Sequence, residues 1–354
     1  MKVERISFVL GLGLFVWLLH RIGLAAITSN LGKLGAGFLV ILALEIVPLL
    51  LATLGWRATR KSLNAVPLRS LVGMRLAGDA VNAVAPAAVL GGEIIRGKLL
   101  SRFVPPAEVL TSVSLAAMAQ FMAQALFVGT GAMILPVPSL QPRLRIAGGA
   151  ILVLLAVFSE VVTRWTAERD GVREQPRFFT WLDTVTRGRL ADFWRWNDLA
   201  ARLGESVRGR NGSLTISILL YTGGWLMAIP EIYLILRFFR APVPVQTAVA
   251  VAVLMVAVEG FFFFVPARAG ILEGGLYAIF SVLGLDPVLG VSLALVRRLR
   301  ELAWAALGLA ILGVADRLPR APRSVPEEQA TQGAAATHDA LAEGLTPESP
   351  RPRW

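Results

Sequence analysis

Apolar runs that are almost free of charge alternate with short polar, mostly basic segments along most of the chain. Each run is about 20 residues long, the length that an α-helix needs to cross the roughly 30 Å hydrocarbon core of a bilayer. The pattern therefore predicts an all-α, polytopic bundle of transmembrane helices. The predicted spans are Ile6–Ile27, Ala36–Trp56, Glu108–Leu135, Leu144–Val162, Leu214–Phe238, Val245–Phe264 and Pro287–Val314.

Two further apolar segments, Leu76–Ile95 and Val265–Leu285, differ from ordinary spans because each is rich in small residues and is broken by proline. Interrupted hydrophobic segments in corresponding positions of two repeats point to the central site of a transporter. Since unpaired backbone groups cannot face lipid, we expect both segments to be buried or to line a watery cavity. They align at an offset of 180 residues, which matches Asp79, Pro86 and Glu93 with Glu259, Pro266 and Glu273. The residues expected to break the helices are Pro86, Gly91, Gly92, Pro266, Gly270 and Gly274.

The membrane domain is expected to cover residues 1–315. Within it, residues 163–212 form the longest polar stretch before the tail and are predicted to be a cytoplasmic loop. The segment Leu190–Arg208 of this loop is either an amphipathic helix on the membrane surface or a soluble helix packed on the bundle. Residues 316–354 are rich in Pro, Ala, Glu and Arg and are expected to be disordered. The total is seven spans, or eight if Ile271–Leu285 crosses as part of a broken helix. That number decides whether the repeat is parallel or inverted.

Lysine and arginine are distributed unevenly between the loops on the two sides of the predicted bundle. If the N-terminus lies in the cytoplasm, most of these residues are cytoplasmic, including Arg57, Arg60, Lys61, Arg69 and Arg75 of one basic linker. Cytoplasmic loops are enriched in basic residues, so we predict a cytoplasmic N-terminus. The formal net charge of +11 fits attraction to anionic lipid. No nucleic-acid-binding motif is present, so membrane lipids are the expected partners and nucleic acid is not.

Composition excludes several kinds of chemistry. The chain is 55% hydrophobic and only 17% charged, whereas ordinary soluble domains carry about 25% charged residues. It has no cysteine and only two histidines, so disulfides, thiolate catalysis and multi-histidine metal sites are not expected. No nucleotide fingerprint or catalytic arrangement is visible. We therefore expect no cofactor, no metal and no enzyme activity.

Charged and polar side chains nevertheless occur in or beside the apolar segments. A charge at the centre of the bilayer costs about 2.5–3.5 kcal/mol on insertion scales, so these residues must pair, snorkel or line a polar cavity. One interpretation is a groove for a lipid headgroup, in which arginines contact an anionic group such as phosphate and the acids hold those arginines or bind a cation. The alternative is that the charges are structural pairs that join broken helices, with Asn82 capping a half-helix. The candidate residues are Asp79, Asn82, Glu93, Arg96, Glu259, Arg268, Glu273, Arg297 and Arg298.

Two motifs carry a resemblance to a known family. The first runs from Gly78-Asp79 to Pro86 and continues through Gly91-Gly92-Glu93 and Arg96, and the second runs from Pro266-Ala267 through Gly270 and Glu273-Gly274, with Arg297 after it. Together they resemble the flippase-like transmembrane domain of the lysylphosphatidylglycerol synthase family, over about residues 1–315.

The resemblance implies a bacterial inner-membrane protein with about eight spans and re-entrant helices. Full-length family members attach lysine to phosphatidylglycerol in a separate cytoplasmic domain and move the product outward. No such domain follows the membrane domain here, so we expect the lipid-translocating part alone. Related stand-alone members resemble proteins associated with hopanoid transport.

Three functions remain open from the sequence. The preferred one is translocation of an amphipathic lipid between leaflets. A scaffold that recruits a lipid-biosynthetic enzyme through residues 163–212 is the second, and an intramembrane transferase that uses Asp79, Glu93 or Glu273 as a base is the least favoured. The chain can also be expected to associate with copies of itself as a homo-oligomer. The identity of the lipid, the direction of transport and its energy source cannot be read from the sequence.

Overall fold

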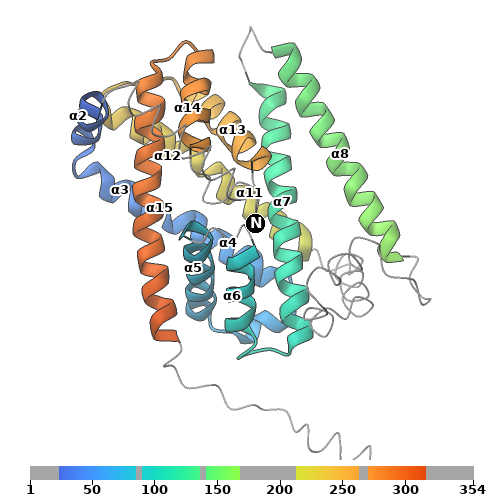
Figure 1. Cartoon of the computed structure of the whole chain (residues 1–354). Helices are drawn as coiled ribbons and strands as arrows, with labels where there is room; N and C mark the ends of the chain where they lie inside the picture. The colour runs from blue at the N-terminus through green and yellow to red at the C-terminus, as the bar shows by residue number, and fades with distance from the viewer. Residues whose placement is uncertain (1–23, 85–89, 136–140, 168–212, 263–269, 316–354) are drawn as a thin grey trace, which may run out of the picture. The chain divides into compact units, whose positions relative to one another are not determined.

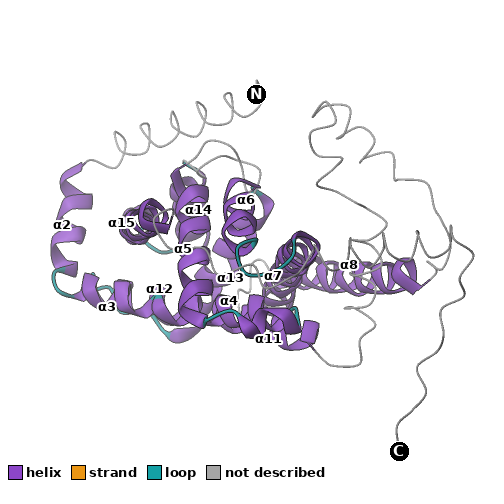
Figure 2. Cartoon of the chain, turned by 90° about the horizontal axis from the view of Figure 1, so that it is seen from below, coloured by secondary structure: helices purple, strands orange, loops and turns teal. Residues whose placement is uncertain are grey.

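The computed structural model describes residues 24–84, 90–135, 141–167, 213–262 and 270–315, and within these ranges the chain is helical and contains no strand. The predicted first span lies mostly outside these ranges, as do the loop 168–212 and the tail 316–354. The elements, drawn in Figures 1 and 2, are α2 Leu24–Leu34, α3 Gly37–Leu44, α4 Ile46–Ala58, the 3-10 turn η1 Lys61–Ala65, α5 Leu68–Val84, α6 Leu90–Leu100, α7 Pro106–Ile134, α8 Gln141–Ala167, α11 Ser213–Leu226, α12 Ala228–Phe238, α13 Val245–Phe261, α14 Ile271–Val282 and α15 Pro287–Ala315.

Four helical stretches of the described chain are long and apolar enough to cross a membrane: Gly37–Ala58, Pro106–Ile134, Gln141–Glu160 and Ser213–Phe238. Helix α15 has 29 residues, about 43 Å at 1.5 Å per residue, but it carries several charges at mid-length. Helix α13 has only 17 residues, about 26 Å, which is short for an untilted crossing. The prediction of an all-helical, multi-pass membrane protein is confirmed at this level.

Two of the predicted spans are kinked rather than continuous. The break between α3 and α4 falls at Glu45, three residues before Pro48, and the break between α11 and α12 falls at Met227, three residues before Pro230. Proline has no N–H, and its ring clashes with the carbonyl four residues earlier, so a helix bends one turn before it. The sequence analysis treated both spans as uninterrupted, and the prolines correct that expectation.

Apart from α2, η1 and α8, the described helices fall into two matching sets of four elements. Each set has a kinked span, then a helix of 17 residues (α5 or α13), a short helix of 11 or 12 residues (α6 or α14) and a helix of 29 residues (α7 or α15). Helix α5 packs against α6, and α13 packs against α14. In Figure 1 the first pair lies in the lower half and the second in the upper half, while α7 and α15 run past both. Corresponding helices after the kinked span therefore have the same or nearly the same length in the two sets.

Buried side chains gather in two apolar clusters, each of which also takes in residues of the other set. The first centres on α4, α5, α6 and α7, with Trp56 and Leu100 among its members, and the second centres on α12 to α15, with Ile232 and Leu276. The most extensive helix contact, between α5 and α15, joins the sets. At this contact Gly308 lets the backbones approach closely, because a Cβ there would lie 2.7 Å from the Cβ of Ala80 in α5.

Helix α8 lies at one edge and packs mainly on α7 (Figure 2). It exposes Ile146, Val153 and Leu154. Such a helix fits contact with lipid.

Candidate functional site

A polar cavity of about 450 Å³ lies among these helices. Its volume is within the range of ordinary small-ligand pockets, about 300–1,000 Å³. Residues of α3, α4, α5, α6, α7, α11, α12, α13, α14 and α15 and of the two kinks line it. Its polar and charged lining residues are Glu45, Arg75, Asp79, Asn82, Glu93, Arg96, Gln120, Gln124, Tyr221, Glu231, Glu259, Arg297, Arg298, Arg300 and Glu301.

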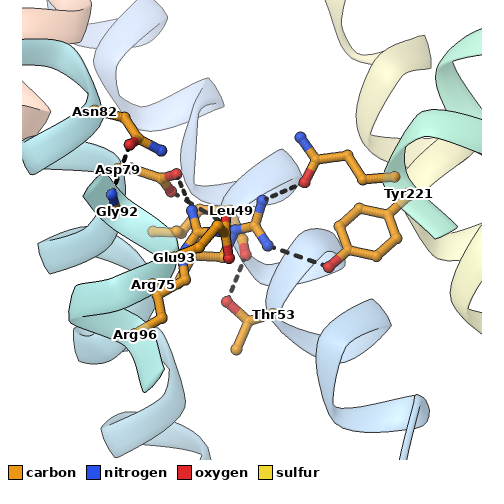
Figure 3. A network of polar contacts seen from close by, with 10 residues as sticks. Leu49, Thr53, Arg75, Asp79, Asn82, Gly92, Glu93, Arg96 and Tyr221 are labelled. Carbon is orange, nitrogen blue, oxygen red and sulfur yellow. Dashed lines mark hydrogen bonds and ion pairs between the residues drawn. The ribbon is translucent and has the colours of Figure 1, made fainter. Parts of the chain in front are cut away.

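The α5–α6 pair contributes one ion-pair cluster to the cavity (Figure 3). The Arg96 guanidinium pairs with the carboxylates of both Asp79 and Glu93. Arg96 is buried, whereas the Asp79 side chain is 48% exposed. The two helices can approach because Gly78 has no side chain, since a Cβ there would lie 2.7 Å from the Cγ of Arg96. The sequence thus places a buried cation behind a more accessible acid.

Arg75 connects this cluster to the neighbouring helices. Its Nη1 donates a hydrogen bond of 3.2 Å to the Tyr221 hydroxyl of α11, and its Nη2 donates one of 3.2 Å to Gln120 Oε1 of α7. Its guanidinium also lies 5.5 Å from the centre of the Tyr221 ring, a cation–π distance. The contact with Asp79 is longer, at 3.6 Å. Buried Arg75 is therefore held mainly by neutral partners.

A second cluster joins the kinked spans to α13 and α15. Arg297 Nη1 lies 2.9 Å from Glu231 Oε2, and its Nη2 lies 3.5 Å from Glu259 Oε1. Arg300 Nη1 lies 2.8 Å from Glu231 Oε1 and also pairs with Glu45. The Glu231 side chain is only 4% exposed. One buried carboxylate is therefore shared by two arginines of α15.

The third group ties α14 to α15. Arg298 Nε lies 3.0 Å from Glu273 Oε1, and Arg298 Nη1 lies 3.3 Å from Glu301 Oε2. Glu273 is 3% exposed and Glu301 is 29% exposed. At Arg96, too, the two acids differ in exposure, since Glu93 is 22% and Asp79 is 48% exposed.

Asn82 and the glycines shape the ends of the short helices. Asn82 Oδ1 accepts a 2.7 Å hydrogen bond from the N–H of Gly92, one of the first-turn amides of α6 that have no partner within the helix. This contact fits the predicted capping role. Gly270 has φ +74° immediately before α14, a conformation that favours glycine.

Three other glycines predicted to break helices lie inside them. Gly91 and Gly92 belong to the first turn of α6, and Gly274 is the fourth residue of α14. Packing gives a reason for glycine at one of these positions: a Cβ on Gly92 would lie 2.5 Å from the Asn82 amide nitrogen and closer still to the Gly78 carbonyl.

Most of the predicted site residues meet at one place. Asp79, Asn82, Glu93, Arg96, Glu259, Arg297 and Arg298 line the cavity, and buried Glu273 contacts Arg298. Arg268, Pro86 and Pro266 lie outside the described residues. Glu45, Arg75 and Glu231 also line the cavity and were not predicted as site residues. Glu45 and Glu231 carried a usable signal, because each is an isolated acid within an apolar span, and such residues mark functional positions by default.

The exposure of the charged side chains determines which of them a ligand that enters the cavity contacts first. The guanidiniums are mostly buried and each described one is paired, whereas Asp79, Glu301 and Glu45 are the more accessible charges. An entering group therefore meets carboxylate oxygens first. In the ranges that the structure describes, no group of His, Cys, Asp and Glu is arranged to hold a metal ion.

Comparison with known proteins gives one match. The profile of the family described as "Lysylphosphatidylglycerol synthase TM region" matches residues 5–309. No curated protein and no solved structure matches the chain significantly.

Proposed function

Because the chain belongs to the lysylphosphatidylglycerol synthase TM-region family, we propose that it moves an amphipathic lipid between the leaflets of a bacterial inner membrane. The headgroup passes through the polar cavity while the acyl chains stay in lipid. The chain performs no covalent chemistry in this proposal. Both a phospholipid and a hopanoid fit it.

The observation that carries the proposal is a cavity lined by five arginines and six carboxylates inside an otherwise apolar bundle. Taking a charged or polar headgroup through hydrocarbon is costly unless polar partners replace its water. Apolar packing holds helices together at least as well as buried ion pairs do. A large set of ion pairs around an open space is therefore better explained by a passing polar group than by stability.

The helix lengths support an inverted repeat. In this arrangement α5–α6 and α13–α14 are re-entrant hairpins that enter from opposite faces. The predicted first span, α3–α4, α7, α8, α11–α12 and α15 cross the membrane. Six crossings and two hairpins make eight embedded segments, and both chain ends then lie in the cytoplasm with their basic residues. Inverted repeats with broken helices place a transporter's site near the midplane.

The cavity geometry refines the role proposed for the arginines. Arg96 and Arg298 are each covered by a carboxylate, Asp79 or Glu301, that is more exposed than the guanidinium. A phosphate reaches either arginine only after that acid moves aside. The donor groups of the headgroup therefore engage the carboxylates first, and the phosphate follows.

A proteoliposome assay tests the proposal. Purified protein is reconstituted with a fluorescent phospholipid, and the loss of fluorescence to an impermeant quencher reports movement between leaflets. We expect Glu273→Gln to slow movement about tenfold or more, equivalent to ~1.4 kcal/mol, because Arg298 loses its buried partner. Asp286→Asn is the matched control. Its side chain is exposed, lies outside the cavity and accepts a bond from the Val288 amide that asparagine can keep.

Equal rates of lipid movement for the wild type and folded Glu273→Gln would contradict a role of the cavity charges in transport. If the wild type moves no lipid but retains a specific lipid-modifying enzyme on purification, the scaffold function replaces this one.

A further inference from the structure

Both proline kinks present an acid to the same arginine. Glu45 is at the α3–α4 break, Glu231 is one residue after Pro230, and both pair with Arg300 of α15. One guanidinium thus links the two kinked spans at the cavity. Nothing in the ion-pair geometry requires both acids, since a single carboxylate neutralises one guanidinium.

The two acids differ in what their loss would do. Glu231 is buried and also neutralises Arg297, so its removal weakens two ion pairs. The Glu45 side chain is 27% exposed to the cavity, and its ion pair is with Arg300. If Glu45 becomes neutral, Arg300 still has Glu231 at 2.8 Å, and Arg297 still has Glu259 at 3.5 Å. Glu45 is therefore the acid of this cluster that can lose its charge without leaving a guanidinium uncompensated.

The polar bonding of the cluster is also incomplete. Among the described residues, the Nε atoms of Arg297 and Arg300 and the Oε1 atom of Glu231 are buried without a hydrogen bond, although Glu231 Oε1 keeps its ion-pair contact with Arg300. Purely structural polar networks tend to be fully satisfied, because each buried unpaired donor costs free energy. An unsatisfied network fits a cluster that has a second arrangement.

Charges of both signs act on Glu45 from the surrounding helices. Ionised Glu45 is attracted by Arg300 and Arg297 of α15 and repelled by Glu231 of α12 and Asp79 of α5. The remaining titratable or charged groups at the cavity are Arg75 of α5, Glu93 and Arg96 of α6, Tyr221 of α11, Glu259 of α13 and Arg298 and Glu301 of α15.

We propose that Glu45 is a proton-binding site, and that its protonation detaches the α3–α4 kink from Arg300. The carboxylate takes one proton from water in the cavity and becomes a neutral acid, and it returns the proton to water before it pairs with Arg300 again. The α12–α15 link through Glu231 persists throughout. In the transport cycle, which rests on the proposed function, this step couples lipid movement to a proton gradient.

Infrared difference spectroscopy tests the site without any transport. The full protein in lipid is compared between mildly acidic and mildly alkaline buffer, and a protonated carboxyl C=O band is followed. We expect wild type to show a band that is missing in Glu45→Gln and shifted but present in Glu45→Asp. Gel filtration confirms that each variant is folded, and Asp286→Asn controls for a change outside the cavity. A band that is unchanged in folded Glu45→Gln would overturn the proposal.

Transport then tests the coupling. In proteoliposomes we expect an imposed proton gradient to accelerate lipid movement by wild type, and Glu45→Gln to move lipid at the same rate with and without the gradient. Dependence on a sodium gradient instead would overturn the proton assignment. If wild type moves no lipid at all, the proposed function fails, whereas the infrared band still decides whether Glu45 binds a proton.

Discussion

Glu231 should contribute more to stability than any of the exposed acids, because two arginines share its carboxylate. Removing one partner of a buried ion pair costs about 3–5 kcal/mol. Arg297 keeps Glu259 at 3.5 Å, and Arg300 keeps Glu45, so we expect Glu231→Gln to cost near the lower limit, about 3 kcal/mol. Glu301→Gln removes a partly exposed partner of Arg298, which keeps Glu273 at 3.0 Å. Exposed pairs of this kind contribute about 1 kcal/mol or less.

The assay is equilibrium unfolding of the purified protein in mixed detergent micelles, with both variants and wild type measured side by side. The reasoning predicts a difference of about 2 kcal/mol between Glu231→Gln and Glu301→Gln. If the two arginines share the Glu231 carboxylate, Arg297→Met or Arg300→Met removes part of the same interaction as Glu231→Gln. Each double variant should then lose less free energy of unfolding than the sum of its two single variants. Equal stability of Glu231→Gln and Glu301→Gln would refute the central role of the shared carboxylate.

Three further substitutions test the packing around the cavity, each by thermal unfolding in detergent. Gly308→Ala should destabilise by about 1–3 kcal/mol because its Cβ would lie 2.7 Å from a side chain of α5, whereas Gly313→Ala has open space and should be near neutral. An equal effect at both glycines would contradict the close helix contact. Tyr221→Phe should cost about 1 kcal/mol, since it removes the hydroxyl bonded to Arg75 but keeps the ring. Asn82→Ala should cost about 1 kcal/mol by uncapping α6, and Asn82→Asp, which can still accept that bond, should lose less.

Hydropathy and scarce charge predicted much of the membrane architecture. The spans at 106–134 and 141–160 lie close to their predicted bounds, because long apolar runs have no other stable arrangement in a bilayer. Pro48 and Pro230 were visible too, but hydropathy averages over them, so the kinks were missed. The acids at those kinks were missed for the same reason.

The partners of the arginines could not be read from the sequence. Successive residues of a helix point about 100° apart, so Arg297 and Arg298 reach different acids. Which acids they reach depends on how α15 is rotated against α12 and α14, and packing sets that rotation. Glycine was ambiguous for another reason, since it can flank a helix in a left-handed conformation, as at Gly270, or let helices approach, as at Gly92.

The most direct test of the central claim is to identify the lipid that the cavity holds. The protein is extracted gently, and its bound lipids are identified by mass spectrometry, with wild type beside the Arg96→Ala, Glu273→Ala double variant and the Asp286→Asn control. A polar headgroup held in the cavity predicts one lipid class enriched on wild type and on the control, and lost from the folded double variant. Equal, non-selective lipid on all three proteins would contradict it and would leave the cavity charges with a structural role alone.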